Sequence, residues 1–152
     1  MTTTLTPQDR MELLQRFLRY VQVDTQSDEN STTSPSTEKQ KDLSRILAEE
    51  LRALGCDDAR MDDWGYVYAT VRANPPDLAQ TVPVIGLIAH VDTAFASSGT
   101  HVKPQVIERY AGGDIPLPGT ADQVLRVAEN PNLTRCLGHT LIHTDGTTLL
   151  GA

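Results

Sequence analysis

The sequence has no apolar run long enough to cross a lipid bilayer, and its N-terminus lacks a basic segment followed by an apolar one. Neither a membrane-spanning helix nor a secretory signal peptide is therefore expected. Basic residues are also few, because 13 Lys and Arg stand against 20 Asp and Glu and give a net charge of −7. Nucleic acids and anionic membranes are bound by clustered basic side chains, so we expect neither as a partner.

Cysteine is also scarce, because the 152 residues contain only Cys56 and Cys136. Two distant thiols are too few for a disulfide scaffold and are typical of a protein kept in a reducing compartment. We therefore expect free thiols and a cytoplasmic location, with one disulfide between the two residues as the alternative.

Two signatures of other chemistries are missing as well. The chain has no glycine-rich phosphate loop and no Gly-x-Ser-x-Gly turn, so nucleophilic serine or cysteine catalysis has no support. What is present is ordinary for a globular protein, with 39% hydrophobic and 22% charged residues. By length alone, 152 residues form one domain.

Two helices are predicted in the first third of the chain. Residues 7–21 follow a capping sequence, and their apolar side chains recur at helical spacing, which predicts an inward stripe of Leu14, Phe17, Leu18 and Val21. After a polar loop over 24–37, a second helix is expected to begin at a cap on Ser34 or Ser36. It is expected to end near Gly55 and to bury Leu43, Ile46, Leu47, Leu51 and Leu54.

The remaining periodicity favours strands. Residues 66–71 are β-branched and aromatic, and Asn74-Pro75-Pro76-Asp77 should end that strand. Residues 84–89 are apolar without alternation, which is typical of a strand buried on both faces. A short strand is expected at 105–108, and Asp145-Gly146 predicts a hairpin between 140–144 and 147–150. Helices alternating with a buried strand indicate an α/β sandwich around a mixed central sheet.

His90 and Asp92 are the leading candidates for chemistry. They lie two residues apart at the exit of the predicted strand 84–89, so their side chains should project to the same side. Histidine is a natural zinc ligand, and a neighbouring carboxylate can orient its imidazole. The alternative from these residues alone is that His90 ends the strand and Asp92 begins a turn.

A second histidine pair is weaker. His139 and His143 are four residues apart, a spacing that would suit a metal on a helix. Their neighbours are strand-like, so two partly exposed strand histidines are favoured. Asp145 is interpreted as the turn residue of the hairpin and His101 as a loop residue.

Four ordered segments are distinctive: Phe17–Val21 with Asp24–Ser27 and Pro35–Glu38, then Ala89–Thr93, Tyr110–Ile115 and Thr144–Ala152. Together they resemble the N-terminal part of peptidase T, the tripeptide aminopeptidase family of the di-zinc exopeptidase superfamily. The resemblance implies a three-layer sandwich with a mixed central sheet, truncated before the sheet is complete. Residues 1–152 would then be the N-terminal part of the catalytic domain, without the lid and dimerisation domain.

The same resemblance implies a site and an activity. His90 matches a zinc ligand, and Asp92 matches the acidic residue that supports the metal site and is carried as a catalytic residue. A complete family member holds two zinc ions, releases the N-terminal residue from tripeptides and is expected to form a homodimer. This chain supplies at most part of one zinc site, so it is expected to be inactive alone. The alternative is a non-enzymatic binding or scaffold module, or a truncated product without function.

Overall fold

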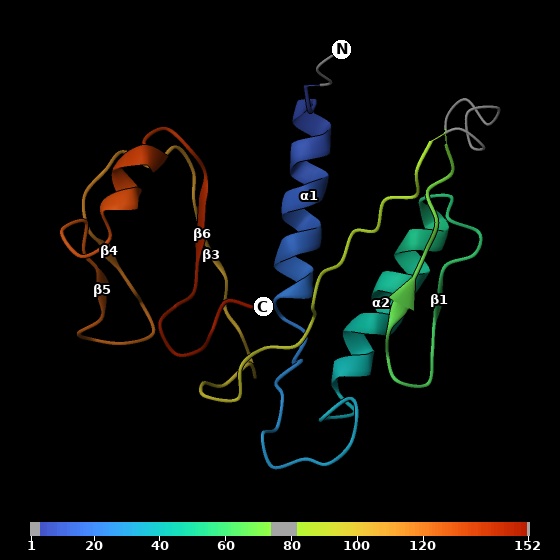
Figure 1. Ribbon diagram of the computed structural model, residues 1–152. Helices are drawn as coiled ribbons and strands as arrows, with labels where there is room; N and C mark the ends of the chain where they lie inside the picture. Colours follow the sequence, from blue (N-terminus) through green and yellow to red (C-terminus); the bar gives the residue numbers. More distant parts are fainter. Residues whose placement is uncertain (1–3, 74–81, 152) are drawn as a thin grey trace.

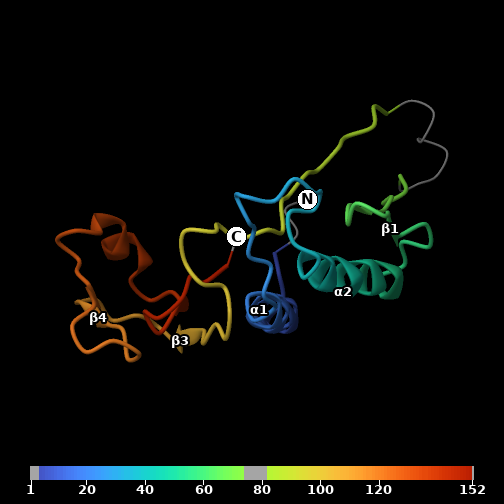
Figure 2. The ribbon, with the colours of Figure 1, turned by 90° about the horizontal axis from the view of Figure 1, so that it is seen from below.

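The computed structural model describes residues 4–73 and 82–151 and gives an extended arrangement of helices and short strands (Figure 1). Helix α1 lies in the middle, α2 with strand β1 lies on one side, and the C-terminal strands lie on the other (Figure 2). The predicted α/β class is confirmed. In the described ranges, no helix is long and apolar enough to cross a membrane.

Helix α1 spans Pro7–Tyr20, as predicted, and begins with a complete capping box. The Thr6 hydroxyl accepts from the Asp9 amide at 3.1 Å, and the Asp9 carboxylate accepts from the Thr6 amide at 2.8 Å. The inward stripe is only partly formed, because none of the residues within α1 is buried and only Val21, at its C-cap, is. Most apolar side chains of this helix therefore still contact water.

Helix α2 spans Gln40–Ala53 and begins later than predicted. Its N-cap residue is Lys39, without a side-chain cap, so the predicted serine caps are wrong. Ser36 instead accepts hydrogen bonds from the Asp28 amide and the Gln40 side chain, at 3.1 and 3.0 Å. These hydrogen bonds stabilise the loop before α2 in place of an N-cap on the helix. Gly55 ends the helix at φ 94°, as predicted.

Strands β1 (Arg60–Met61) and β2 (Val67–Tyr68) pair antiparallel and contact α2. The sequence predicted a longer strand over 66–71 and missed β1. The turn between them is held by Asp62, whose Oδ1 accepts from the amides of Trp64 and Tyr66 at 3.0 and 2.9 Å. The predicted break at 74–77 lies outside the described residues.

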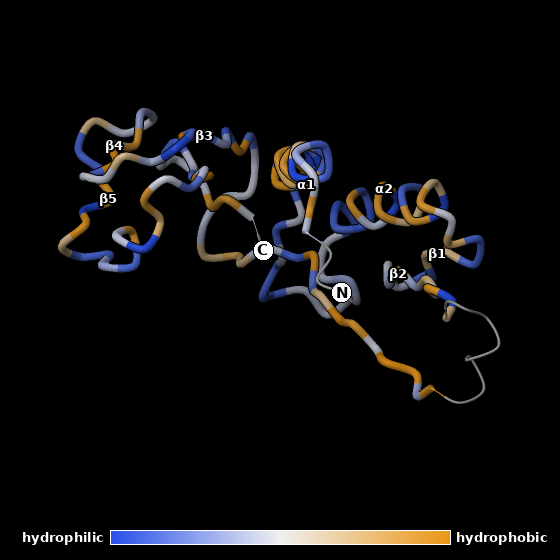
Figure 3. Tube along the Cα trace, turned by 90° about the horizontal axis from the view of Figure 1, so that it is seen from above, coloured by the Kyte–Doolittle hydropathy of each residue, from blue (hydrophilic) through white to orange (hydrophobic). Residues whose placement is uncertain are grey.

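The segment 84–89 is not a strand, contrary to the prediction. It runs as an unpaired, fully exposed stretch, visible as the long apolar section of the tube in Figure 3. Val84 is 100% exposed and Ile88 is 99% exposed. A buried strand needs a neighbour for its backbone groups and a cover for each face. No described residue supplies either, so the apolar pattern alone could not form the strand.

The C-terminal part carries three features. Strand β3 (Gln105–Ile107), expected from the sequence, pairs antiparallel with β6 (Leu141–His143), so that Gln105 faces His143. Strands β4 (Ile115–Pro116) and β5 (Val124–Leu125) form another pair, and a 3₁₀ helix spans Pro131–Cys136. Strands β4 and β5 and the 3₁₀ helix were not predicted, because elements this short leave no clear periodic signal in the sequence.

The predicted hairpin is therefore wrong. The partner of β6 is β3, and residues 147–150 are not a strand. Gly146, at φ 97°, still forms a turn, and Asp145 accepts from the Thr147 amide at 2.9 Å. The turn residues were correctly identified, but they close a loop and not a two-stranded ladder.

The strands form three separate two-stranded sheets in the described part of the chain. Buried apolar residues divide accordingly into a set around α2 and a set in the C-terminal part. They are Leu43, Ala48, Cys56 and Ala59 in the first set and Val102, Tyr110, Ile115 and Leu117 in the second, with Val21 at the end of α1 as the remaining one among the described residues. The single mixed sheet of a three-layer sandwich stays a prediction.

Candidate functional site

The structure brings His90 and Asp92 together at the end of the exposed apolar segment. The His90 Nδ1 lies 3.2 Å from Asp92 Oδ1 and 3.1 Å from the Asp92 carbonyl oxygen. The two side chains are 71% and 49% exposed. The two side chains thus lie within hydrogen-bonding distance of each other and are open to solvent.

The protonation pattern of His90 follows from its neighbours. Both groups within reach of Nδ1 are oxygens that accept hydrogen bonds, which favours the tautomer of the neutral imidazole with the proton on Nδ1. The lone pair is then on Nε2, which has no hydrogen bond within 4–73 and 82–151. This is the arrangement by which a carboxylate orients a metal-ligating histidine.

The pair could supply one ligand of a zinc site, the His90 imidazole, together with the carboxylate that orients it. An imidazole nitrogen oriented by a carboxylate is a donor that zinc accepts readily. A zinc site needs three or four such ligands, and the residues that the structure describes contain no cluster of three His, Cys, Asp or Glu. His90 and Asp92 could therefore contribute to a metal centre that other residues would have to complete.

Residue Thr93 fastens the pair to the rest of the chain. It forms an isolated parallel bridge with Gln26, its amide donates to the Thr25 carbonyl at 3.2 Å, and its carbonyl accepts from the Ser27 amide at 2.9 Å. Thr25 and Thr93 are both buried. Sequence reasoning missed this contact, because the two segments are more than sixty residues apart and share no local pattern.

A cavity of about 170 Å³ lies beside the pair, between α1, α2 and the segment 90–93. Its lining includes His90 and Thr93 together with the apolar side chains of Phe17, Leu43 and Leu47. The Thr93 hydroxyl is buried without a hydrogen-bond partner in the described residues.

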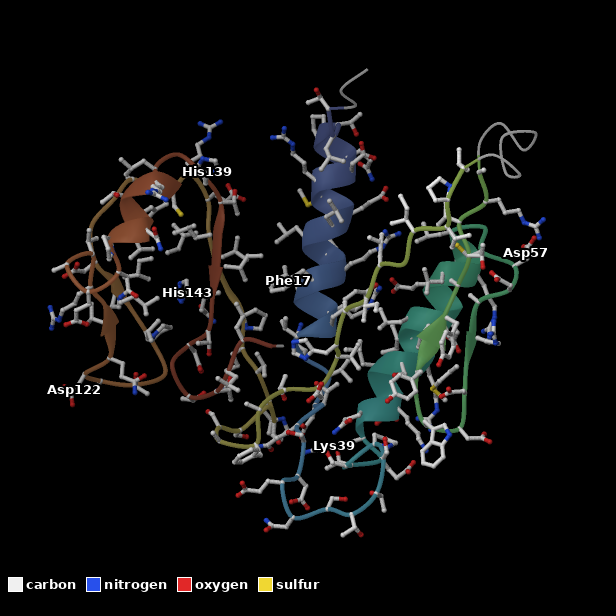
Figure 4. The ribbon with its side chains drawn as sticks, in the orientation of Figure 1. Phe17, Lys39, Asp57, Asp122, His139 and His143 are labelled. Atoms are coloured by element: carbon white, nitrogen blue, oxygen red, sulfur yellow. The ribbon has the colours of Figure 1, made fainter. Side chains whose placement is uncertain are left out.

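The second histidine pair does not form a site. His143 is buried on β6 and its Nδ1 lies 2.7 Å from the Thr144 carbonyl oxygen, whereas His139 is exposed in a bend outside the strand. Figure 4 shows the two side chains at different places in the C-terminal part. The prediction of two partly exposed strand histidines is therefore corrected for both residues. Cys56 and Cys136 are free thiols, as predicted.

Sequence comparison identifies relatives of known name. The chain is 52% identical over 143 residues to peptidase T of Geobacillus thermodenitrificans and, equally, to peptidase T of Geobacillus kaustophilus. It is 52% identical over 140 residues to peptidase T of Desulfitobacterium hafniense. These matches cover 94%, 94% and 92% of the chain but only 34%, 34% and 33% of the relatives. No family profile matches the sequence.

The fold is α/β, and in it an imidazole lies within hydrogen-bonding distance of a carboxylate. The relatives identify the family, because about half of the aligned residues are identical over nearly the whole chain. The chain is a homologue of peptidase T, consistent with its N-terminal part, and the predicted resemblance is confirmed. It spans about one third of the length of the curated relatives that it matches.

Proposed function

We propose that this sequence serves as the N-terminal part of the catalytic domain of a zinc-dependent aminopeptidase that releases the N-terminal residue from tripeptides. The support is the identity to proteins named peptidase T together with the His90–Asp92 pair. The complete protein would hold two zinc ions, act in the cytoplasm and form a homodimer.

The observation that carries this proposal is the contact between His90 Nδ1 and Asp92 Oδ1 at 3.2 Å. It leaves Nε2 of His90 as the zinc-binding atom. Asp92 acts through the histidine: it holds the ring in one orientation and one tautomer. Bound zinc would lower the pKa of a water and polarise the scissile carbonyl.

The exposed segment 84–89 supports the proposed three-layer sandwich. Its side chains are apolar on both faces, and its backbone is unpaired among the described residues. A segment of this kind is stable in the centre of a sheet, between two strands and two layers of helices. We propose that residues 84–89 form such a strand when the remaining two thirds of a peptidase T are present.

The test is a chimaera in which residues 1–152 replace the matching segment of the Geobacillus thermodenitrificans peptidase T. Zinc-dependent release of the N-terminal residue from a tripeptide is the expected result. His90→Ala should abolish this turnover. Asp92→Asn should lower kcat/KM by about 10- to 100-fold, as expected for a partner that orients a metal ligand.

The matched control is His101→Ala, which removes an exposed loop imidazole of the same type. It should leave turnover unchanged. A chimaera that folds but stays as active with His90→Ala as without it would contradict the assignment. The isolated chain should show negligible tripeptide hydrolysis even with added zinc, because its described residues supply one oriented imidazole at most. Appreciable turnover by it would contradict the need for further ligands.

A further inference from the structure

The His90–Asp92 pair is held from one side only. The exposed segment before it makes no backbone hydrogen bonds to other described residues, and the backbone bonds that anchor residues 82–93 are all made by Thr93. Thr93 is hydrogen bonded to Thr25 and Ser27, so whatever fixes residues 24–27 and the turn after Thr93 also fixes the direction in which the imidazole is presented.

Gln26 fixes that turn with its side chain. Its Nε2 donates to the carbonyl oxygens of Phe95 and Ser97, at 3.1 and 2.8 Å. The backbone carbonyl of Gln26 accepts from the Thr37 hydroxyl at 2.8 Å. One residue thus joins the loop before α2 to the turn that follows the pair.

Asp24 lies at the centre of the same junction and joins three segments. Its Oδ1 accepts from the Gln26 amide at 3.0 Å, and Oδ2 accepts from the Thr100 hydroxyl at 2.7 Å. Lys39, at the start of α2, donates to Oδ2 at 3.0 Å and lies 2.9 Å from Oδ1. Lys39 is labelled in Figure 4, below the first turn of α2.

The carboxylate is charged in this setting. Burial works to raise the pKa of Asp24, but the hydrogen bonds from Lys39, Thr100 and the Gln26 amide outweigh it, and the pKa lies below its ordinary value. The turn after Thr93 also packs closely against Thr93 and Asp24, because a Cβ on Gly99 would lie 3.1 Å from the Thr93 hydroxyl and 3.5 Å from Asp24 Oδ1. The junction therefore has little room for another arrangement.

We propose that Asp24 is a positioning residue for the His90–Asp92 pair, acting through Gln26, Lys39 and Thr100 on the turn that begins at Thr93. This inference rests on the proposed function of His90 as a zinc ligand. With the carboxylate in place, the turn holds Asp92 where it accepts from His90 Nδ1. Without it, the turn loosens and the imidazole returns to the mixture of tautomers of a solvated histidine.

The test uses the isotope-labelled 152-residue chain and two variants. The NMR chemical shifts of the imidazole nitrogens report the tautomer of His90. A zinc titration followed on the same ring signals reports the affinity of the chain for zinc. In the parent, the Nδ1–H tautomer should dominate. Asp24→Asn, which removes the charge, and Thr100→Val, which removes one donor, should both shift the ring toward Nε2–H. Both should weaken zinc binding by about tenfold, at the low end for loss of an outer partner.

Two further variants control for general effects. Thr100→Ser keeps the hydroxyl and should restore the behaviour of the parent, and Asp28→Asn removes an exposed carboxylate from the same loop and should change nothing. The proposal is overturned if Asp24→Asn and Thr100→Val melt earlier but keep the tautomer and the zinc affinity, or if Asp28→Asn has the same effect as Asp24→Asn. Should Asp24→Asn not fold, Thr100→Val and Thr100→Ser decide.

The two proposals fail in different ways. If zinc leaves the His90 signals of the parent unchanged, His90 is not a zinc ligand in this chain, and the proposed function loses its support. The tautomer comparison between the parent and the junction variants still decides the role of Asp24, because it requires no metal.

Discussion

The two sides of His90 differ sharply. On its C-terminal side, Thr93 is buried and hydrogen bonded to a loop more than sixty residues away. On its N-terminal side, residues 84–89 are apolar and almost fully exposed. The backbone groups of Thr93 have hydrogen-bond partners in a distant loop, whereas the apolar side chains of residues 84–89 are covered by no other described residue. The His90–Asp92 contact is thus present, but only the chain on its C-terminal side is hydrogen bonded to other described residues.

The same contrast separates the two helices. Helix α2 contacts β1 and β2 and buries Gln40, Leu43, Ser44 and Ala48, whereas α1 buries none of its own residues. The two helices are joined by polar contacts, in which Glu50 of α2 accepts from the Tyr20 hydroxyl and pairs with Arg16 and Arg19 of α1. Helix α1 thus has a complete N-terminal cap, but its apolar side chains are not buried.

The largest expected effect concerns the exposed segment. An unpaired apolar stretch is a template for pairing with another chain, so the protein should self-associate at high concentration. Replacing Val84 and Ile88 with Asp should raise the apparent dissociation constant of this association by at least about 100-fold, because the two aliphatic side chains together contribute about 3–6 kcal/mol when buried. Sedimentation velocity measures the change.

The control for that experiment is Leu54→Asp, at an exposed apolar residue outside the segment. It should leave the association unchanged. A parent protein that sediments as a clean monomer at high concentration would contradict the comparison between the two sides of His90.

A smaller effect is expected in the comparison of the helices. Leu43 is 7% exposed and Leu13 is 51% exposed. Leu43→Ala should lower the free energy of unfolding by about 2–4 kcal/mol, because it removes buried methyl groups and leaves a cavity. Leu13→Ala should lower it by less than about 1 kcal/mol. Urea unfolding of both variants measures the difference, and equal losses would show that α1 is packed as well as α2.

The smallest effect is confined to acid. The Thr147 hydroxyl and amide, together with Lys103, hold the pKa of the buried Asp145 carboxyl below its ordinary value of about 3.9. The charged form is therefore favoured in the folded state. Its contribution to stability should be complete above the unfolded-state pKa and should be lost as the pH falls through the folded-state pKa.

Urea midpoints measured from about pH 5 down to about pH 2 test this dependence. Asp145→Asn cannot titrate and should show a shallower loss of stability than the parent over that range. Asp122→Asn, at an exposed carboxyl in the same part of the chain, is the matched control and should follow the parent. Identical curves for the parent and Asp145→Asn would contradict the lowered pKa.

Local signals in the sequence predicted local features well. The Thr6–Asp9 capping box, the stop at Gly55 and the turn at Gly146 need only neighbouring residues, and all three are present. His90 and Asp92, two residues apart in the sequence, also lie within hydrogen-bonding distance, as their spacing predicted. Predictions that required a distant partner fared worse: the strand over 84–89 is unpaired, and β6 pairs with β3 and not with the residues that follow it.

The sequence by itself therefore determined the helices, the turns, the presence of the His90–Asp92 pair and the homology to peptidase T, because each depends on residue type and short-range spacing. Only the tertiary structure decided that Thr93 meets Gln26, that Asp24 gathers Lys39 and Thr100, and that the apolar segment stays exposed. The physical reason is that hydrogen bonds and burial between distant segments depend on which groups the folded chain brings within reach, and short-range patterns carry no record of that.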